Sequence, residues 1–330
     1  MSGNLTDGSI TVTTSENDKV QIVLNGVKIA CSSGPAIDAH SADKCFITLA
    51  EGTQNSLSDG SAFTSEDANA CIYATCDLTI NGSGLLDVSD NYRHGVFSKD
   101  DLVVYGGSIN VSAVEDGLNG KGGQAGEAPS DLGQAPDAQG GMERGGQAPG
   151  GQGGAPGASD SNCLIQINGG TVVLDSQGDG VDSNGNVEIN GGTLLVNGPS
   201  SDGDGAFDYD GEATISGGTV LMAGAVGMAQ SFTSGTQSFA LVQASGSAGS
   251  VIEATDADGN VIATLTATKA FGCVLVSGAG VSDGDTITVS VDGAATMATA
   301  STTGTSGIAT GGMGDGPATG NRPEGQGGPA

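Results

Sequence analysis

Apolar and polar residues alternate in short runs along the first two thirds of the chain, and a glycine pair interrupts many of these runs. The clearest copies begin at Ile165, Val187 and Ala213 and read IQINGGTVVL, VEINGGTLLV and ATISGGTVLM. Alternation with a period of two predicts β-strands that are buried on one face. The glycine pair predicts a corner between two short strands.

The interrupted runs recur at a nearly fixed interval. Gly82 and Gly106, and then Gly169, Gly191 and Gly217, mark the same corner about two dozen residues apart. A shorter phrase, such as Asp-Gly-Leu or Asp-Gly-Val, precedes the copies and supplies a third strand. Self-similarity at this period indicates a solenoid. We therefore predict an all-β fold, a single-stranded right-handed parallel β-helix with three short strands per coil and a small C-terminal β cap.

The pattern also divides the chain. We assign residues 1–231 to the β-helix, with a disordered Gly/Gln/Pro-rich loop at 122–161 that is too poor in apolar residues to order itself. Residues 232–298 contain separate strand-like runs and an Asp258-Gly259 hairpin signal, which predict a small C-terminal β unit. Residues 299–330 are predicted to be a disordered Gly/Pro-rich tail.

The composition narrows the class of partner. The chain has 38 Asp+Glu against 9 Lys+Arg, and its formal net charge of −29 disfavours nucleic acid and anionic membranes as direct partners. No apolar run is long enough to span a bilayer, and the N-terminus lacks the features of a signal peptide. The six cysteines fit small buried side chains, although a disulfide framework stays open.

Acidic residues recur in the turns of the repeat. Aligning coils on the glycine of the shorter phrase places Asp116, Asp179 and Asp204 in one column. Stacked carboxylates repel one another, and Ca²⁺ prefers such oxygen ligands. We therefore predict calcium at one or more clusters, whereas the alternative is that each Asp only solvates a turn. The candidate metal ligands are Asp116, Asp179, Asp182, Asp202, Asp204, Asp208 and Asp210.

Side chains suited to catalysis or sugar binding are fewer than the acidic candidate metal ligands. A polysaccharide lyase needs a basic residue near the uronate, and the candidates near acidic turns are Arg93, Lys99 and Lys121. For each of them, a solvated or salt-bridged surface cation is the favoured interpretation. Tyr209 lies between two Asp residues, where it would flank a bound sugar or pack against its own coil. We assign no catalytic residue, which favours a non-catalytic protein and leaves enzyme activity open.

Several phrases together resemble a known family. The run from Lys19 to Ile29, the phrase Asp77-Leu-Thr-Ile-Asn-Gly-Ser-Gly, the phrase Val114-Glu-Asp-Gly-Leu-Asn-Gly-Lys and residues 178–230 look like the bacterial carbohydrate-binding domain family typified by a clostridial pectin-binding β-helix protein. The resemblance implies a pectate-lyase-like β-helix, secreted or at the cell surface, that binds calcium and acidic polysaccharide such as polygalacturonate. It also implies that residues matching the Asp-Gly phrases, Asp116 and Asp179 among them, lie at family-typical positions.

Three functions follow as hypotheses. The first is non-catalytic, calcium-dependent binding of uronate polysaccharide at the cell surface. The second is a lyase of the pectate-lyase type. The third is a structural surface protein or adhesin in which calcium only stabilises the fold. The oligomeric state and the exact glycan are left open by the sequence.

Overall fold

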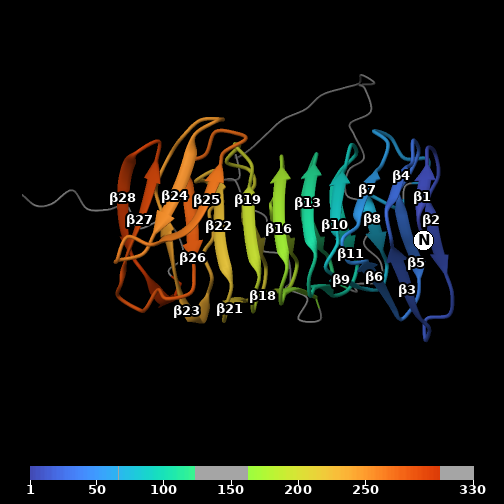
Figure 1. Cartoon of the computed structure of the whole chain (residues 1–330), viewed down its shortest axis with the longest axis horizontal. Coiled ribbons are helices and arrows are strands. Elements are labelled where there is room, and N and C mark those ends of the chain that lie inside the picture. Colours follow the sequence, from blue (N-terminus) through green and yellow to red (C-terminus); the bar gives the residue numbers. More distant parts are fainter. Residues whose placement is uncertain (66, 123–162, 305–330) are drawn as a thin grey trace, which may run out of the picture.

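The computed structural model describes residues 1–65, 67–122 and 163–304, and these residues form β-strands without a helix. Most strands pair in parallel and fall into three rows that run along the long axis of the molecule (Figure 1). Row 1 contains β3 (Lys19–Leu24), β6 (Lys44–Leu49), β9 (Asp77–Gly82), β12 (Leu102–Val104), β15 (Leu164–Ile167), β18 (Asn186–Ile189) and β21 (Ala213–Ile215). Row 2 contains β1 (Gly3–Leu5), β4 (Val27–Ala30), β7 (Gln54–Ser58), β10 (Leu85–Ser89), β13 (Ser108–Ala113), β16 (Thr171–Ser176), β19 (Thr193–Asn197) and β22 (Thr219–Gly224). Row 3 contains β2 (Ile10–Thr13), β5 (Ile37–Ser41), β8 (Ala70–Ala74), β11 (His94–Ser98), β14 (Leu118–Gly120), β17 (Val181–Ser183) and β20 (Phe207–Tyr209).

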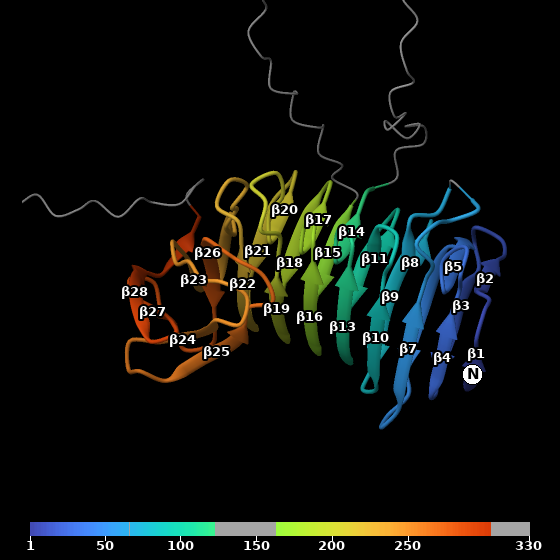
Figure 2. The same cartoon turned by 90° about the horizontal axis from the view of Figure 1, so that it is seen from above.

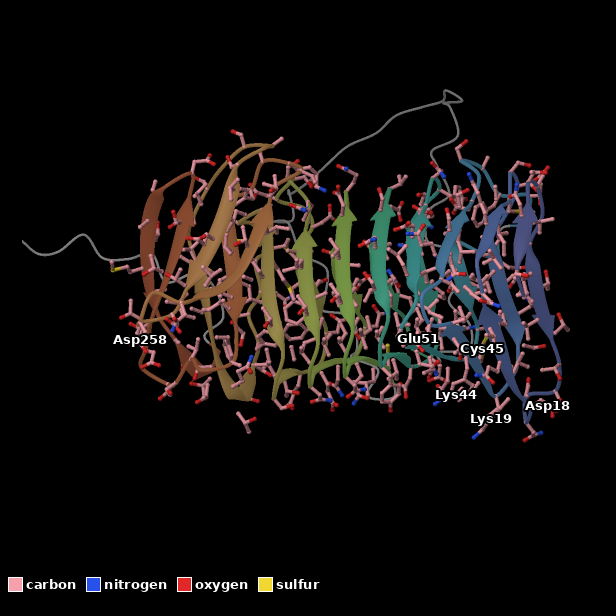
Figure 3. All side chains as sticks on the ribbon, viewed as in Figure 1. Asp18, Lys19, Lys44, Cys45, Glu51 and Asp258 are labelled. Carbon is pink, nitrogen blue, oxygen red and sulfur yellow. The ribbon has the colours of Figure 1, made fainter. Side chains whose placement is uncertain are left out.

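Each strand pairs with the strand of the same row in the next copy of the repeat, so successive coils stack on one another. Lys19 pairs with Lys44 and Ile47 pairs with Ile80, for example, and Figure 3 shows Lys19 and Lys44 near each other at one corner. Figure 2 shows β14, β17 and β20 of row 3 along one edge of the stack, opposite β13 and β16 of row 2. Equivalent residues of successive coils therefore form columns in space.

The interior is a stack of aliphatic columns. In row 3, Ile72, Val96, Leu118 and Val181 follow one another in register, and each is 0–1% exposed. Rows 1 and 2 contribute similar columns to the same continuous cluster. No single coil can bury its own apolar face, so each coil depends on its neighbours for stability. This explains how a chain with 3% aromatic residues builds a core.

The glycine pair forms the predicted corner between rows 1 and 2. Gly170, Gly192 and Gly218 have φ between +80° and +95°, a region that side chains disfavour. A Cβ on Gly192 would lie 2.7 Å from the Gly170 carbonyl oxygen. Stacked corners thus require glycine both for backbone conformation and for the close approach of the neighbouring coil.

The C-terminal part adds antiparallel strands. β23 (Ser234–Val242), β26 (Cys273–Ser277) and β29 (Ser301–Thr303) extend the sheet of rows 1 and 2, and β26 also pairs with β22. A separate four-stranded sheet has the order β25 (Val261–Thr266), β24 (Val251–Thr255), β27 (Thr286–Val291) and β28 (Ala294–Thr299). The turn between β24 and β25 contains Gly259 at φ +84°, at the predicted hairpin.

Some predicted segments differ from the structure or lie outside it. Residues 301–303 lie within the tail that was predicted to be disordered, but they form β29 because they pair with β23. The predicted loop at 122–161 falls almost wholly outside the described residues, as does the tail from 305 onward. All six cysteines are buried, as predicted for small packed side chains. The described part contains no helix long and apolar enough to cross a membrane.

Candidate functional site

A polar cleft of about 500 Å³ opens beside the N-terminal ends of β11, β14 and β17 in row 3. Most of its lining residues lie in turns that lead from row 2 into row 3, whereas Lys121 follows β14. The lining residues are Asn69, Arg93, His94, Val114, Glu115, Asp116, Lys121, Gln177, Gly178, Asp179 and Asp204.

The strand register brings two of the predicted acidic residues together. The backbone N–H of Gly117 donates to the Asp179 carbonyl oxygen, so Asp116 and Asp179 occupy the same position in adjacent coils. The Asp179 N–H also donates to Asp116 Oδ1 at 2.9 Å. The column continues in the other direction to His94, because the Gly95 N–H donates to the Asp116 carbonyl oxygen.

Asp204 does not belong to this column, contrary to the predicted alignment. Val181 pairs with Phe207, which places Gly205 rather than Asp204 level with Asp179. The physical reason is one additional residue, Ala206, between the Asp-Gly pair and the strand. Asp204 nevertheless lines the same cleft from its turn.

Three carboxylates converge at the cleft. Asp116, Asp179 and Asp182 each place an oxygen within 4.8 Å of the others. A fourth polar group, the Asn119 amide, lies between them, and its Nδ2 donates to Oδ2 of both Asp116 and Asp182. Asn119 is 0% exposed, and its Oδ1 has no hydrogen-bond partner. The register explains this contact, since Asn119 pairs with Asp182.

Cationic and neutral groups compensate part of the negative charge. Lys121 Nζ lies 2.6 Å from Asp182 Oδ2, with 38% of its side chain exposed. On the opposite side, His94 Nδ1 lies 3.0 Å from Asp116 Oδ2. His94 Nε2 is 3.7 Å from Glu115 Oε2, which also pairs with Arg93 Nε at 2.7 Å. The site thus consists of acids enclosed by basic side chains.

Burial alters the acidity of this cluster. It raises the pKa of Asp179 to about 8, with added repulsion from Asp116 and Asp182. Burial also raises the pKa of Asp182 to about 6, although Lys121 opposes that effect. For Asp116, burial acts in the same direction, but hydrogen bonds to His94 and Asn119 outweigh it and lower the pKa. Near neutral pH the cluster therefore retains a proton that a bound cation would displace.

The other predicted metal ligands lie around this centre. Asp208 pairs with Asp182 one coil further on and accepts a hydrogen bond from Gln230. Asp202 accepts a hydrogen bond from the Gly227 N–H in an exposed turn. Asp210 is exposed at the end of row 3. The structure therefore groups Asp116, Asp179 and Asp182 closely, with Asp204 and Asp208 at the periphery and Asp202 and Asp210 apart from the cluster.

Two of the four predicted sugar-contacting residues line the cleft, and two do not. Arg93 and Lys121 line the cleft, whereas Lys99 follows β11 and is not among the lining residues. Tyr209 is half-buried against the interior, and its hydroxyl donates to the Ser231 carbonyl oxygen. That hydroxyl is thus engaged within the fold.

Sequence reasoning missed Asn119 and His94 as members of the site. Asn119 stands three residues after Asp116, as Asp182 stands three residues after Asp179. Comparing these two phrases position by position would have identified the second column. His94 likewise precedes a glycine in an equivalent phrase.

A second group of acids lies at the corner between rows 3 and 1. Asp77, Asp100 and Asp101 each place an oxygen within 4.8 Å of the others, and Lys44 Nζ pairs with Asp77 at 3.0 Å. Burial and the two neighbouring acids raise the pKa of Asp101 to about 6. These residues are only partly buried, unlike Asp116 and Asp182.

Comparisons with known proteins give partial matches. A solved structure described as a polysaccharide lyase-like protein from C. thermocellum, a gadolinium derivative, is 27% identical with a TM-score of 0.45, over 66% of this chain and 79% of that one. A carbohydrate-binding domain-containing protein of Acetivibrio thermocellus is 38% identical over 117 residues, which are 34% of this chain. The chain spans 41% of that relative's length. Residues 1–124 match the family model described as carbohydrate-binding domain-containing protein.

Proposed function

We propose that this protein is a right-handed parallel β-helix that binds acidic, uronate-containing polysaccharide through calcium, without catalysis. The observation that carries the proposal is the convergence of Asp116, Asp179 and Asp182 at the edge of a cleft, which Asp116 and Asp179 line together with Arg93 and Lys121. A chain of net charge −29 repels a polyanion unless cations lie between the two. The match of residues 1–124 to a carbohydrate-binding family model supports a glycan as the partner.

The residues of the cleft fit a calcium ion. Calcium takes six to eight oxygen ligands in flexible geometry, and carboxylate and amide oxygens are among those it prefers. Asp116, Asp179 and Asp182 offer carboxylates, and the unpartnered Asn119 Oδ1 belongs to an amide that already lies between two of them. Rotating that amide by half a turn would exchange a donor for an acceptor. A bound calcium ion would supply positive charge and open ligand positions for a uronate carboxylate.

The side chains around the cluster have distinct roles in this proposal. Lys121 neutralises Asp182 when no other cation does so, and its partial exposure leaves the ammonium free to reach a uronate. Arg93 is held beside the cleft by Glu115 and presents a second cation to the polyanion. His94 fixes the orientation of Asp116. Because uronate polysaccharides are found outside cells, we also propose a secreted or cell-surface location.

The test is binding to polygalacturonate in calcium and in EDTA, with Asp179→Asn as the key variant. Burial raises the pKa of Asp179 to about 8, so the neutral Asn resembles the protonated carboxyl of the calcium-free state and should fold. Its oxygen can still accept the Gly205 N–H. The matched control is Asp87→Asn, which changes an exposed acid on β10 that contacts Asn110.

We expect calcium-dependent retention on polygalacturonate for the native protein and for Asp87→Asn, and loss of retention for Asp179→Asn. Retention unchanged by EDTA would remove the calcium bridge from the proposal. Release of unsaturated oligouronides, followed by ultraviolet absorbance, would instead identify a lyase. Calcium-dependent thermal stabilisation without retention on any glycan would identify the structural alternative.

A further inference from the structure

Two carboxyl groups are stacked behind the cleft. Asp59 follows β7 and Asp90 follows β10, and the register that pairs Ser58 with Ser89 places these acids in adjacent coils. Each is only 6% exposed. Two carboxylates this close and this buried cannot both be ionised without a large electrostatic cost. Asp116 and Asp182 have His94 and Lys121 as ion-pair partners, whereas within the described residues Asp59 and Asp90 accept hydrogen bonds from backbone N–H groups and the Asn91 amide.

The hydrogen bonds distinguish the two acids. Asp90 Oδ1 accepts the N–H groups of Tyr92 and Arg93, and Asp90 Oδ2 accepts the Val114 N–H at 3.0 Å. Both oxygens of Asp90 are thus acceptors, as an ionised carboxylate requires. Asp59 Oδ1 accepts the Asn91 N–H at 2.6 Å, whereas Asp59 Oδ2 has no donor.

We propose that Asp59 and Asp90 share one proton, carried on Asp59 Oδ2, and that this proton keeps Asp90 in place as the acceptor that positions Arg93 and Val114 in the wall of the cleft. The shared proton does not depend on the proposed function. The positioning role of Asp90 rests on the proposed function, since Arg93 and Val114 line the cleft assigned to the glycan.

The surroundings of the pair favour a retained proton. Burial, a hydrogen bond to Asp90 and the charge of Asp90 raise the pKa of Asp59 to about 8. A titratable group beside both carboxyls is the thiol of Cys71, which in turn lies near Cys31. Burial and the two nearby carboxyls raise the pKa of Cys71 well above its usual value, so this thiol stays neutral. The Arg93 guanidinium is engaged by Glu115 instead.

The proton is tested by chemical denaturation of the full chain between pH 5 and pH 9. The folded-state pKa of Asp59 lies above that of a free carboxyl, so the stabilisation is complete below about pH 4 and is lost as pH rises towards 8. Asp59→Asn keeps an N–H donor in place of the O–H and cannot titrate. We expect the folding constant of the native protein, divided by that of Asp59→Asn, to fall about tenfold per pH unit between pH 5 and the folded-state pKa of Asp59, which is about 8. Parallel profiles would overturn the shared proton.

The assignment of the proton is tested by comparing Asp59→Asn with Asp90→Asn at pH 6. Asp90→Asn keeps one acceptor oxygen and sets its NH₂ group against either the Val114 N–H or the N–H groups of Tyr92 and Arg93, so exchange of the Arg93 or the Val114 amide proton should accelerate at least tenfold. Asp59→Asn and the exposed control Asp87→Asn should leave that exchange unchanged. Equal effects of the two buried substitutions would overturn the assignment. If Asp90→Asn does not fold, the pH profile of Asp59→Asn still decides whether a proton is shared.

These measurements separate the inference from the proposed function. Denaturation and amide exchange need neither glycan nor calcium, so failure of every variant to bind polygalacturonate would count against the proposed function alone. If the native protein binds, Asp90→Asn should lose at least tenfold in affinity at pH 6 while Asp59→Asn retains it. Full affinity in Asp90→Asn would overturn the positioning role.

Discussion

Replacing Lys121 with Met tests whether its ammonium and calcium compete for the same carboxylates. Removing one member of a fully buried ion pair costs about 3–5 kcal/mol, whereas an exposed pair contributes about 0–1 kcal/mol. The Asp182 side chain is 11% exposed and that of Lys121 is 38% exposed, so solvent screens the pair in part. We therefore expect Lys121→Met to lose about 1–2 kcal/mol of unfolding free energy in EDTA at pH 8.

The loss should depend on pH and on calcium. Burial raises the pKa of Asp182 to about 6 even with Lys121 present, and without the ammonium this pKa rises further. Below pH 6 the carboxyl takes up a proton, so the destabilisation shrinks. Calcium should bind the variant about tenfold more tightly, since 1.4 kcal/mol corresponds to a factor of ten and no ammonium must be displaced.

The assay is urea denaturation in EDTA and in calcium, combined with calorimetric titration of calcium. Lys99→Met is the matched control, because Lys99 directly follows the neighbouring strand β11, as Lys121 follows β14, but does not line the cleft. An unchanged or weakened calcium affinity in Lys121→Met would refute the shared position of ammonium and metal. A destabilisation that persists undiminished at pH 5 would refute the electrostatic account of the contact between Lys121 and Asp182.

Three further outcomes are expected. In EDTA the unfolding free energy of the native protein should fall as pH rises from about 4 towards 8, because burial raises the pKa of Asp179 to about 8. Saturating calcium should flatten the pH dependence of the difference in unfolding free energy between the native protein and Asp179→Asn. Leu174→Ala should cost about 2–5 kcal/mol in denaturation, because Leu174 is 0% exposed in an interior column; a cost under 1 kcal/mol would contradict close packing there. Gly180→Ala should destabilise the fold severely, since its Cβ would lie 2.4 Å from the Ala206 carbonyl oxygen, whereas Gly203→Ala, with open space around it, should be near neutral by thermal melting.

The sequence was informative wherever one residue type serves every coil. Alternating aliphatic residues and a paired glycine identify the strands and corners, because every coil must bury the same face and turn at the same place. The sequence therefore predicted the all-β character and the three strands per coil. β29 was missed, since Ser301–Thr303 pairs with a strand more than sixty positions earlier, and no local pattern encodes that contact.

The candidate site was predicted less completely than the strands. Asp116 and Asp179 align because their turns have equal lengths, whereas the extra Ala206 displaces Asp204. Asn119 contacts two acids because an outward position of one coil lies level with Asp182 of the next. Register errors of one residue thus decide which side chains meet, and a repeat alignment alone does not fix them.

The corner between rows 3 and 1 has a consequence for engineering. In the other coils two to five residues join the two strands, with only two between Ser183 and Asn186, yet β14 ends at Gly120 and β15 begins only at Leu164. The strands on either side keep their pairing with the coils above and below. Extra chain is therefore accommodated at this corner without disturbing the stack. A reporter peptide grafted between Ser183 and Asn186 would be displayed at the same corner, one coil further on.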